Sequence, residues 1–420
     1  MTKNLLSLDF IIFITMSMGA LFMGPVTIGQ VIILCLIFFI YLRIDYALLI
    51  NSAGLQKIGH YKIYLLIITL ILIVAPALAS KINEGNQIYV HDNVQQLEAA
   101  TEFLMNGQNP YEQNYAPFFI DNEYIGTTTG KKLPNPAIEH VITLPGHILL
   151  SVPVYLTSKL IFDFYDQRLL YFIAYFITVL ILILIPNKLK NKIILGSLFA
   201  LNPLILKFFY EGRNDILLLC FIIASIYLLI KQRPRLASLM LGLALTIKHF
   251  AFILLPFFVA YYYWQMPPNL KWNDKLWGLF KKIWPMPIVW LIINLPFIIW
   301  NTQAFYQDTI AYPLGLTAAS YPVSGFGFSA WLEIHNIELF LPLWLIQVVV
   351  SGAVLYFLLK LQKKINAAAI LVLNFTILLF VFLILSRFFN DNYISFIVQL
   401  LMVTYFINHG DQKIARENVL

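Results

Sequence analysis

The sequence predicts an all-α polytopic membrane protein with about twelve transmembrane helices and one long polar interval after the first few of them. Its composition supports this class. Hydrophobic residues make up 60% of the 420 residues, charged residues make up 12%, and the mean hydropathy is +0.78. A soluble domain has about a quarter charged residues. The excess apolar surface must therefore face lipid, and we expect a single membrane domain over residues 1–420.

Charge and cysteine content argue against several other classes. The formal net charge of +7 does not indicate nucleic-acid binding, because Lys and Arg gather in loops between apolar runs. Both cysteines, Cys35 and Cys220, lie inside apolar runs, so we expect no disulfide, zinc site or thiol chemistry. Only Lys3 precedes the first apolar run and no small-residue cleavage motif follows it, which indicates a retained helix rather than a signal peptide.

Apolar runs that can form transmembrane helices lie on both sides of the polar interval. Several are shorter than the ~20 residues that a straight span needs. Two short neighbours meet at Lys248 and His249, and short or broken helices are where membrane proteins place polar function. In chain order the runs are residues 5–23, 26–42, 61–79, 169–186, 193–209, 216–230, 236–247, 250–264, 283–300, 339–359, 367–385 and 393–408.

Basic residues set the expected orientation, because cytoplasmic loops carry an excess of Lys and Arg. This rule places both termini in the cytoplasm. It places residues 80–168 and residues 301–338, a loop rich in aromatics and glycine, on the outer face. The clusters assigned to the cytoplasm are Arg43/Lys57/Lys62, Lys188/Lys190/Lys192, Lys231/Arg233/Arg235, Lys271/Lys275/Lys281/Lys282, Lys360/Lys363/Lys364 and Lys413/Arg416.

One apolar run inside the long polar interval is assigned to the surface. An odd number of crossings must separate the outer loop from Lys188, so only one of the runs 137–160 and 169–186 can span. We expect residues 137–160 to be interfacial or re-entrant on the outer face. The alternative is that this run spans and the positive-inside rule fails at one loop. The run contains Glu139, His140, Pro145, His147, Pro153 and Lys159.

Two further segments read as surface helices. In residues 93–106, apolar positions recur at helical spacing and Gly107 follows as a stop, so we expect a second interfacial helix on the outer face. In residues 265–282, Trp272, Trp277 and Phe280 alternate with lysines. That pattern is typical of an anchor on anionic lipid headgroups of the cytoplasmic leaflet.

Polar residues concentrate on the outer side, with Asp92 as the leading candidate acid. A carboxylate facing a cavity can act as general base for a hydroxyl acceptor, and nearby Lys and Arg can hold a phosphate leaving group. Nucleotide sugars are cytosolic, so a lipid-linked sugar phosphate is the donor that fits this side. We expect Asp92 to meet four outer turns in one cavity, namely residues 210–215, 246–249, 387–393 and 163–168.

Several short motifs follow one another along the chain: Asn202-Pro203, Gly212-Arg213-Asn214-Asp215, Arg233-Pro234, Gly242-Leu243-Ala244 and Lys248. In this order they resemble the membrane core of C-superfamily glycosyltransferases, and the nearest branch is glycosyltransferase family 87, which uses polyprenyl-phosphate mannose. Residues 99–111 resemble the segment after that family's first outer-loop acid, and residues 388–393 resemble its last outer turn.

The resemblance implies an inverting transfer of a hexose, mannose first, from a polyprenyl-phosphate donor to a glycan or glycolipid hydroxyl. It implies a bacterial plasma (inner) membrane, a role in the cell envelope, a catalytic acid at Asp92, and no cofactor. The outer loop has no Asp-x-Asp pair, so a divalent metal is not required. The donor phosphate is expected at Arg213, Lys248 and Arg387. Arg213 stands where the family more often has Gln or His, and His249 where it often has Pro, which leaves the sugar open.

Each candidate also has a structural reading. Asp92 or Asn93 can cap the helix 93–106, and the poorer acids are Glu84, Glu98 and Glu102. Asn214 and Asp215 can tie two helix ends together with Arg213, Lys248 can snorkel, and Arg387 can pair with Asp391. His140 and His147 can hold a metal but are read as ordinary histidines. The expected substrate-binding residues are Arg213, Asn214, Asp215, Lys248, His249, Arg387, Arg168 and His91, the last beside the base.

A second class also fits the pattern. Many crossings and a basic cavity suit a transporter or flippase of a lipid-linked or anionic substrate. Such proteins usually contain repeated halves, and this sequence shows no internal repeat. The long outer loop with surface helices favours the transferase.

Overall fold

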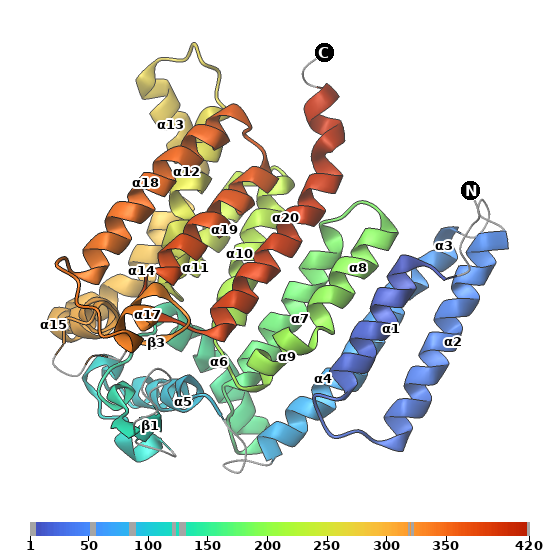
Figure 1. Cartoon of the computed structure of the whole chain (residues 1–420), viewed down its shortest axis with the longest axis horizontal. Coiled ribbons are helices and arrows are strands. Elements are labelled where there is room, and N and C mark those ends of the chain that lie inside the picture. Colours follow the sequence, from blue (N-terminus) through green and yellow to red (C-terminus); the bar gives the residue numbers. More distant parts are fainter. Residues whose placement is uncertain are drawn as a thin grey trace. The chain divides into compact units, whose positions relative to one another are not determined.

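The computed structural model describes residues 6–50, 56–83, 90–119, 123–125, 132–317, 320 and 323–417, and these are mostly helical (Figure 1). The chain divides into two compact units. The first unit comprises Met1–Tyr89, Phe176–Glu211 and Tyr405–Leu420, and the second comprises Val90–Tyr175 and Gly212–Thr404. Each unit is described by itself below.

The first unit is a group of apolar helices. One predicted run, residues 193–209, forms two helices bent by 44° to each other. Pro203 begins the second of these, because a residue without an N–H is tolerated in the first turn, and the Asn202 side chain caps it. The helices of the first unit are α1 (Leu8–Leu21), α2 (Ile28–Ile50), α3 (Gln56–Gly59), α4 (Tyr61–Asn83), the end of α7 (Arg168–Leu184), α8 (Leu189–Ala200), α9 (Pro203–Tyr210) and the end of α20 (Asp391–Glu417).

A buried ionic cluster joins α1, α2 and α4. The Lys62 Nζ lies 2.7 Å from Asp9 Oδ2 and 2.6 Å from Asp45 Oδ1, and the Tyr41 hydroxyl donates to Asp9. Lys62 is only 4% exposed. Two carboxylates from other helices hold this lysine in the packed interior, since a buried charge needs partners. The cytoplasmic side expected for the Arg43/Lys57/Lys62 cluster stays a prediction.

The second unit carries the apolar helices α10 (Asp215–Ile230), α11 (Pro234–Leu245), α12 (Leu255–Trp264), α14 (Pro285–Trp300), α18 (Leu343–Lys364) and α19 (Ala368–Ile384), with the starts of α7 and α20. Gly242 lets α11 approach α14 closely, because a Cβ there would lie 2.9 Å from the Met286 backbone. At one end of these helices lies α13 (Trp272–Ile283) (Figure 1). Its Trp272 and Trp277 are exposed, as expected for the amphipathic segment.

At the opposite end of the second unit, the segments predicted as outer loops gather (Figure 1). The strands pair as an antiparallel hairpin, β1 with β2, and a parallel pair, β3 with β4, in which Ser324 faces Phe388. The elements are α5 (Asp92–Met105), η2 (Pro110–Glu112), η3 (Ala116–Phe118), β1 (Glu123–Ile125), β2 (Lys132–Pro134), η4 (Pro136–Ile138), α6 (Pro145–Phe162), η5 (His249–Ile253), α15 (Thr302–Tyr306), the π-helical turn η6 (Gln307–Ala311), α16 (Tyr312–Leu314), β3 (Ser324–Gly325), α17 (Phe328–Ile334) and β4 (Phe388–Phe389).

The two helices expected on the outer face differ in their limits from the prediction. Helix α5 begins at Asp92 rather than residue 93. Helix α6 begins only at Pro145, where a missing N–H is harmless, and the preceding residues 136–138 form a 3₁₀ turn. The Gly146 N–H donates to the Thr246 carbonyl at 2.9 Å, which joins the start of α6 to the turn that precedes Lys248.

Within the described residues, three helices are long and apolar enough to cross a bilayer: Ile28–Ile50, Lys57–Ser80 and Leu343–Lys364. The number rises to five if the bent pairs α8 with α9 and α13 with α14 each count as one span. Several other apolar helices are shorter. The helical fold and these spans indicate a membrane protein, whereas the twelve crossings and the position of the termini stay predictions.

Candidate active site

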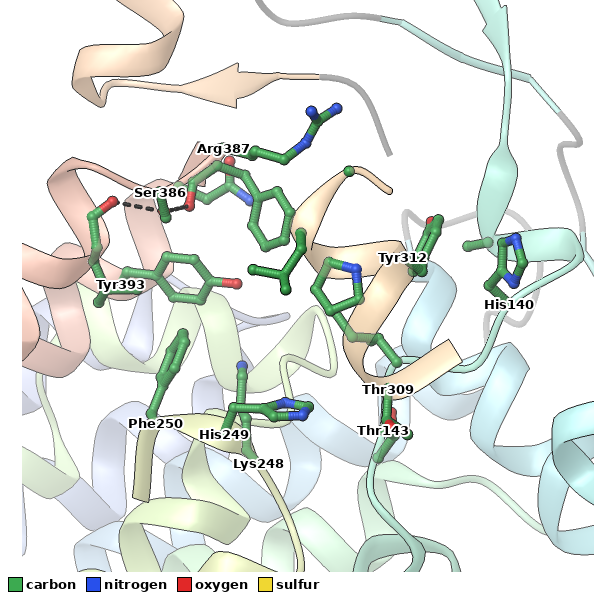
Figure 2. A pocket seen from close by; sticks show the side chains of 18 of the residues that line it. His140, Thr143, Lys248, His249, Phe250, Thr309, Tyr312, Ser386, Arg387 and Tyr393 are labelled. Carbon is green, nitrogen blue, oxygen red and sulfur yellow. Dashed lines mark hydrogen bonds between the residues drawn. The ribbon is translucent and has the colours of Figure 1, made fainter. Parts of the chain in front are cut away.

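A cavity of about 640 Å³ lies within the second unit and collects most of the predicted site residues. Figure 2 shows Lys248 and His249 at one side of it, Tyr393 and Tyr312 on opposite sides, and Arg387 on the side away from Lys248. The predicted residues that line it are His91, Asp92, Arg213, Asn214, Lys248, His249 and Arg387. The sequence expectation that one chamber joins the Asp92 carboxylate to the cations therefore agrees with the geometry.

Asp92 is the first residue of α5, and His91, not Asp92 or Asn93, occupies the N-cap position. The Asp92 Oδ1 accepts from the Asn93 N–H at 2.8 Å and lies 2.8 Å from the His91 Nδ1. The same Nδ1 lies 3.1 Å from the Asn93 N–H, and one nitrogen cannot both accept and donate. A proton on Nδ1 satisfies all three groups, because the Asn93 N–H has Asp92 as its acceptor. His91 then orients the carboxylate.

The Asp92 carboxylate is ionised in this setting. Burial alone would raise its pKa, but the charge and hydrogen bond of His91 and the charge of Arg213 outweigh burial and lower the pKa to about 2. Both contacts of the carboxylate fall on Oδ1. Among the described residues Oδ2 has no hydrogen-bond partner, so it can accept a hydrogen bond from a ligand.

Lys248 lies between α11 and η5 and has an extended backbone conformation. Its side chain is held by acceptors at the start of α10 and in the turn that precedes α10. Its Nζ donates to Asp215 Oδ1 at 2.6 Å and to Asn214 Oδ1 at 3.0 Å. It also lies 4.8 Å from the ring centre of Phe250 and 5.2 Å from that of Tyr393. Burial would lower the pKa of Lys248, but Asp215 more than offsets this, so the pKa is raised and the ammonium keeps its charge.

Asp215 does not line the cavity. Its second oxygen accepts from the Asn392 amide at the start of α20, so Asp215 ties α10, α20 and the Lys248 turn together. The alternative interpretation, in which Asp215 helps to tie helix ends together, therefore agrees with these contacts. Asp215, expected as a substrate-binding residue, is instead placed to position Lys248.

Arg168 lies outside the cavity, contrary to the expected convergence. Its side chain is buried, and its Nε and Nη2 donate to Asp166 at 3.0 and 2.7 Å. Its stem supports Gly212, whose φ of +81° makes the turn that presents Arg213. Arg168 is drawn away because Asp166 lies two residues before it and offers a fork-shaped acceptor.

Arg387 lines the cavity from the turn between α19 and α20. Its carbonyl accepts from the Ser324 N–H at 3.1 Å, so the parallel pairing of β3 and β4 fixes this turn. The guanidinium lies against Gly315, where a Cβ would stand 2.2 Å from one of its nitrogens. Gly315 has a φ of +78°, so its lack of a side chain admits both the turn and the arginine.

The other candidate acids have different positions. Glu98 accepts from the Gln167 N–H at 2.8 Å, and burial raises its pKa to about 8. Glu102 is exposed on α5. Glu84 lies outside the described residues.

His140, which lines the cavity, is paired with Asp308, a residue that no sequence pattern singled out. His140 Nδ1 lies 2.7 Å from Asp308 Oδ1, and Asp308 Oδ2 accepts from the Val141 N–H at 2.8 Å. The two residues are 168 positions apart in the sequence, so no local spacing of residues predicts this pair. His147, the proposed companion of His140, is buried in α6 against Tyr171 instead. The two histidines share no helical face.

Within the described ranges, no group of three or more His, Cys, Asp or Glu side chains is placed to hold a metal ion. That the reaction requires no divalent metal stays a prediction.

A helical membrane protein with one carboxylate and several cations around a cavity fits an enzyme or carrier of an anionic substrate. Residues 147–264 match the family model described as "Alpha-(1->6)-mannopyranosyltransferase, N-terminal domain". This match supports a mannosyltransferase-type glycosyltransferase. The matched span contains Arg213, Lys248 and His249, but neither Asp92 nor Arg387. No curated protein matches the chain. Membership of glycosyltransferase family 87 stays a prediction.

Proposed function

We propose that the protein is an integral membrane mannosyltransferase that uses a polyprenyl-phosphate donor. It moves the hexose to a hydroxyl of a glycan or glycolipid on the outer face of the membrane, with inversion. The observation that carries the proposal is that Asp92 lines the same cavity as Arg213, Lys248 and Arg387. A base and a set of phosphate-binding cations are the two components that such a transfer needs.

The cavity suits a donor that is part lipid and part phosphate. Its volume of about 640 Å³ falls within the usual range of roughly 300–1,000 Å³ for ligand pockets. Apolar side chains from α16, α18 and α19 complete its wall, including Leu314, Leu343 and Phe382. We assign this wall to the first isoprene units of the donor, because a water-soluble sugar phosphate would gain nothing from it.

In the proposed reaction, the acceptor hydroxyl gives its proton to Asp92 Oδ2 as its oxygen attacks the anomeric carbon. The bond between that carbon and the phosphate oxygen breaks on the opposite face, and the phosphate leaves with the electron pair. Arg213 and Lys248 stabilise the charge that develops on it. A bound donor anion near Arg213 would also raise the pKa of Asp92 from about 2, which makes the carboxylate a better base once the donor is present.

The test is transfer from radiolabelled polyprenyl-phosphate mannose to a mannose oligosaccharide by the full chain in liposomes. Asp92→Asn is expected to lower the rate about 10²- to 10⁴-fold, the usual contribution of a positioned base. The matched control is Glu102→Gln, an exposed acid on the same helix that does not line the cavity. Equal rates for the Asp92→Asn protein and wild type contradict the base assignment. Movement of the donor lipid across the bilayer without any transfer favours a carrier.

A further inference from the structure

A second cavity, of about 610 Å³, adjoins the first within the second unit. His140 and Leu316 line both cavities. The second cavity is formed by residues just before α6 and by the segment from α15 to residue 317. Neither the sequence patterns nor the proposed reaction assigns it a role.

Its lining differs in chemistry from that of the first cavity. The described residues around it include no Lys or Arg, so a phosphate has no counter-charge there. It offers side-chain amides from Gln303 and Gln307, the Glu139 carboxylate, the Thr317 hydroxyl and the ring of Tyr306. Amides, carboxylates and hydroxyls match the hydroxyl groups of a neutral sugar, which both donate and accept. An aromatic ring supplies a flat apolar surface for the C–H face of a pyranose.

The groups that would contact such a ligand are available. Gln303, Tyr306 and Gln307 are exposed, and Tyr306 retains 48% of its surface. In the part of the chain that the structure describes, the Gln303 and Gln307 side-chain amides make no hydrogen bond to another described residue, so a ligand would displace none of these residues from them.

The backbone that presents these groups is held firmly. Helix α15 begins at the Asn301 cap, whose side chain accepts from the Ala304 N–H at 3.0 Å and donates to Glu112. Phe305 packs edge-on against Tyr111 at 5.2 Å between ring centres. These contacts fix the register of α15, so Gln303 and Tyr306 keep their positions beside the cavity.

The π-helical turn η6 separates two neighbouring side chains. Asp308 is buried and bonded to His140 and to the Val141 N–H, whereas Gln307 is exposed and lines the second cavity. π-helical turns are rare and often mark functional sites. The His140 ring lies beside the Tyr312 ring (Figure 2), tilted against it with 4.6 Å between ring centres, and it lines both cavities. Asp308 holds this ring in place.

We propose that the second cavity binds a neutral mannose-type sugar ring of the acceptor, with Tyr306 under the ring and Gln303, Gln307 and Glu139 on its hydroxyls. This inference rests on the proposed function, since it names the acceptor site of that reaction. Because His140 and Leu316 line both cavities, an acceptor bound in the second lies beside the first, which Asp92 lines. The site recognises sugar rather than charge.

The test measures binding apart from catalysis. α-(1→6)-Mannotriose and maltotriose are titrated against the full chain in detergent by saturation-transfer difference NMR. We expect mannotriose to bind, and Tyr306→Ala and Gln307→Ala each to weaken it about tenfold, the loss of one ring contact or of one to two hydrogen bonds. Tyr306→Phe keeps the ring and is expected to bind within about twofold of wild type.

Trp331→Ala is the matched control, because Trp331 is an exposed aromatic of the same unit that lines neither cavity. Equal binding by all variants, or binding of neither oligosaccharide by wild type, overturns the inference. The transfer assay separates it from the proposed function. Transfer with an unchanged acceptor KM in Tyr306→Ala refutes the acceptor site alone. Oligosaccharide binding through Tyr306 without any transfer refutes the transferase alone.

Discussion

The ion pair of Lys248 with Asp215 is predicted to couple by about 2 kcal/mol in the free energy of unfolding. Their side chains are only 17% and 12% exposed, and Nζ lies 2.6 Å from Oδ1. Opposite charges about 4 Å apart at an effective dielectric constant of 20 attract by about 4 kcal/mol. Desolvation of the two charges opposes this attraction. In Asp215→Asn, the Asn214 side-chain oxygen and the rings of Phe250 and Tyr393 still stabilise the Lys248 ammonium, so the expected coupling is smaller than the full attraction.

A double-mutant cycle checks this estimate. Unfolding is measured in mixed micelles for wild type, Asp215→Asn, Lys248→Met and the double variant, and the coupling is the departure from additivity. The exposed pair of Glu123 with Lys132, at 3.2 Å, serves as control and is expected to show no measurable coupling. Additive effects at Lys248 and Asp215 would refute the claim that Asp215 holds this lysine in place.

Three further outcomes follow from the site. Arg168→Ala is expected to lower the free energy of unfolding by about 3 kcal/mol, because it leaves Asp166 buried without its guanidinium partner. It is expected to change the donor KM less than Arg213→Ala does, because only Arg213 lines the cavity. A larger KM change for Arg168→Ala in steady-state assays would contradict this. Gly212→Ala is expected to lower both the melting temperature and the transfer rate, because Gly212 has a φ of +81° and a Cβ there would stand 2.2 Å from Val94. An unaltered transfer rate would be inconsistent with the idea that this turn positions Arg213. The Asp92 pKa of about 2 lies below the ~3.9 of an unfolded chain, so the stability that its charge contributes is present above about pH 4 and is lost as the pH falls towards 2. The unfolding free energies of wild type and Asp92→Asn should therefore converge between pH 5 and pH 2, and a constant difference would show that the carboxyl is not so perturbed.

Much of the helical layout could be predicted because its signals are local. Apolar runs long enough to be helices, and prolines at their starts, depend only on neighbouring residues. The break that the prediction missed within residues 193–209 also has a local cause, since Asn202-Pro203 is a cap followed by a first-turn proline. The number of spans is less accessible, because short apolar helices serve equally as spans and as buried core.

The candidate site was only partly accessible in the same way. Asp92, Arg213, Lys248 and Arg387 stand out because polar residues between apolar runs are costly and few. Their partners were less accessible. Asp215 was expected either as a substrate contact or as a tie between two helix ends, and only the structure shows that it bonds to Lys248. Nothing near His140 in the chain points to Asp308.

The sequence by itself determined that this is a helical membrane protein and that a carboxylate and several cations lie near the ends of its helices. These properties follow from composition and from the order of residues over short distances. Only the tertiary structure decided which charges face the cavity and which neutralise one another. In the folded chain Arg168 pairs with Asp166, and Lys62 pairs with both Asp9 and Asp45. His140 pairs with Asp308 within the second unit. A buried charge is stabilised by whichever partner the folded chain brings within hydrogen-bonding distance, and residues far apart in the sequence acquire that distance only through packing.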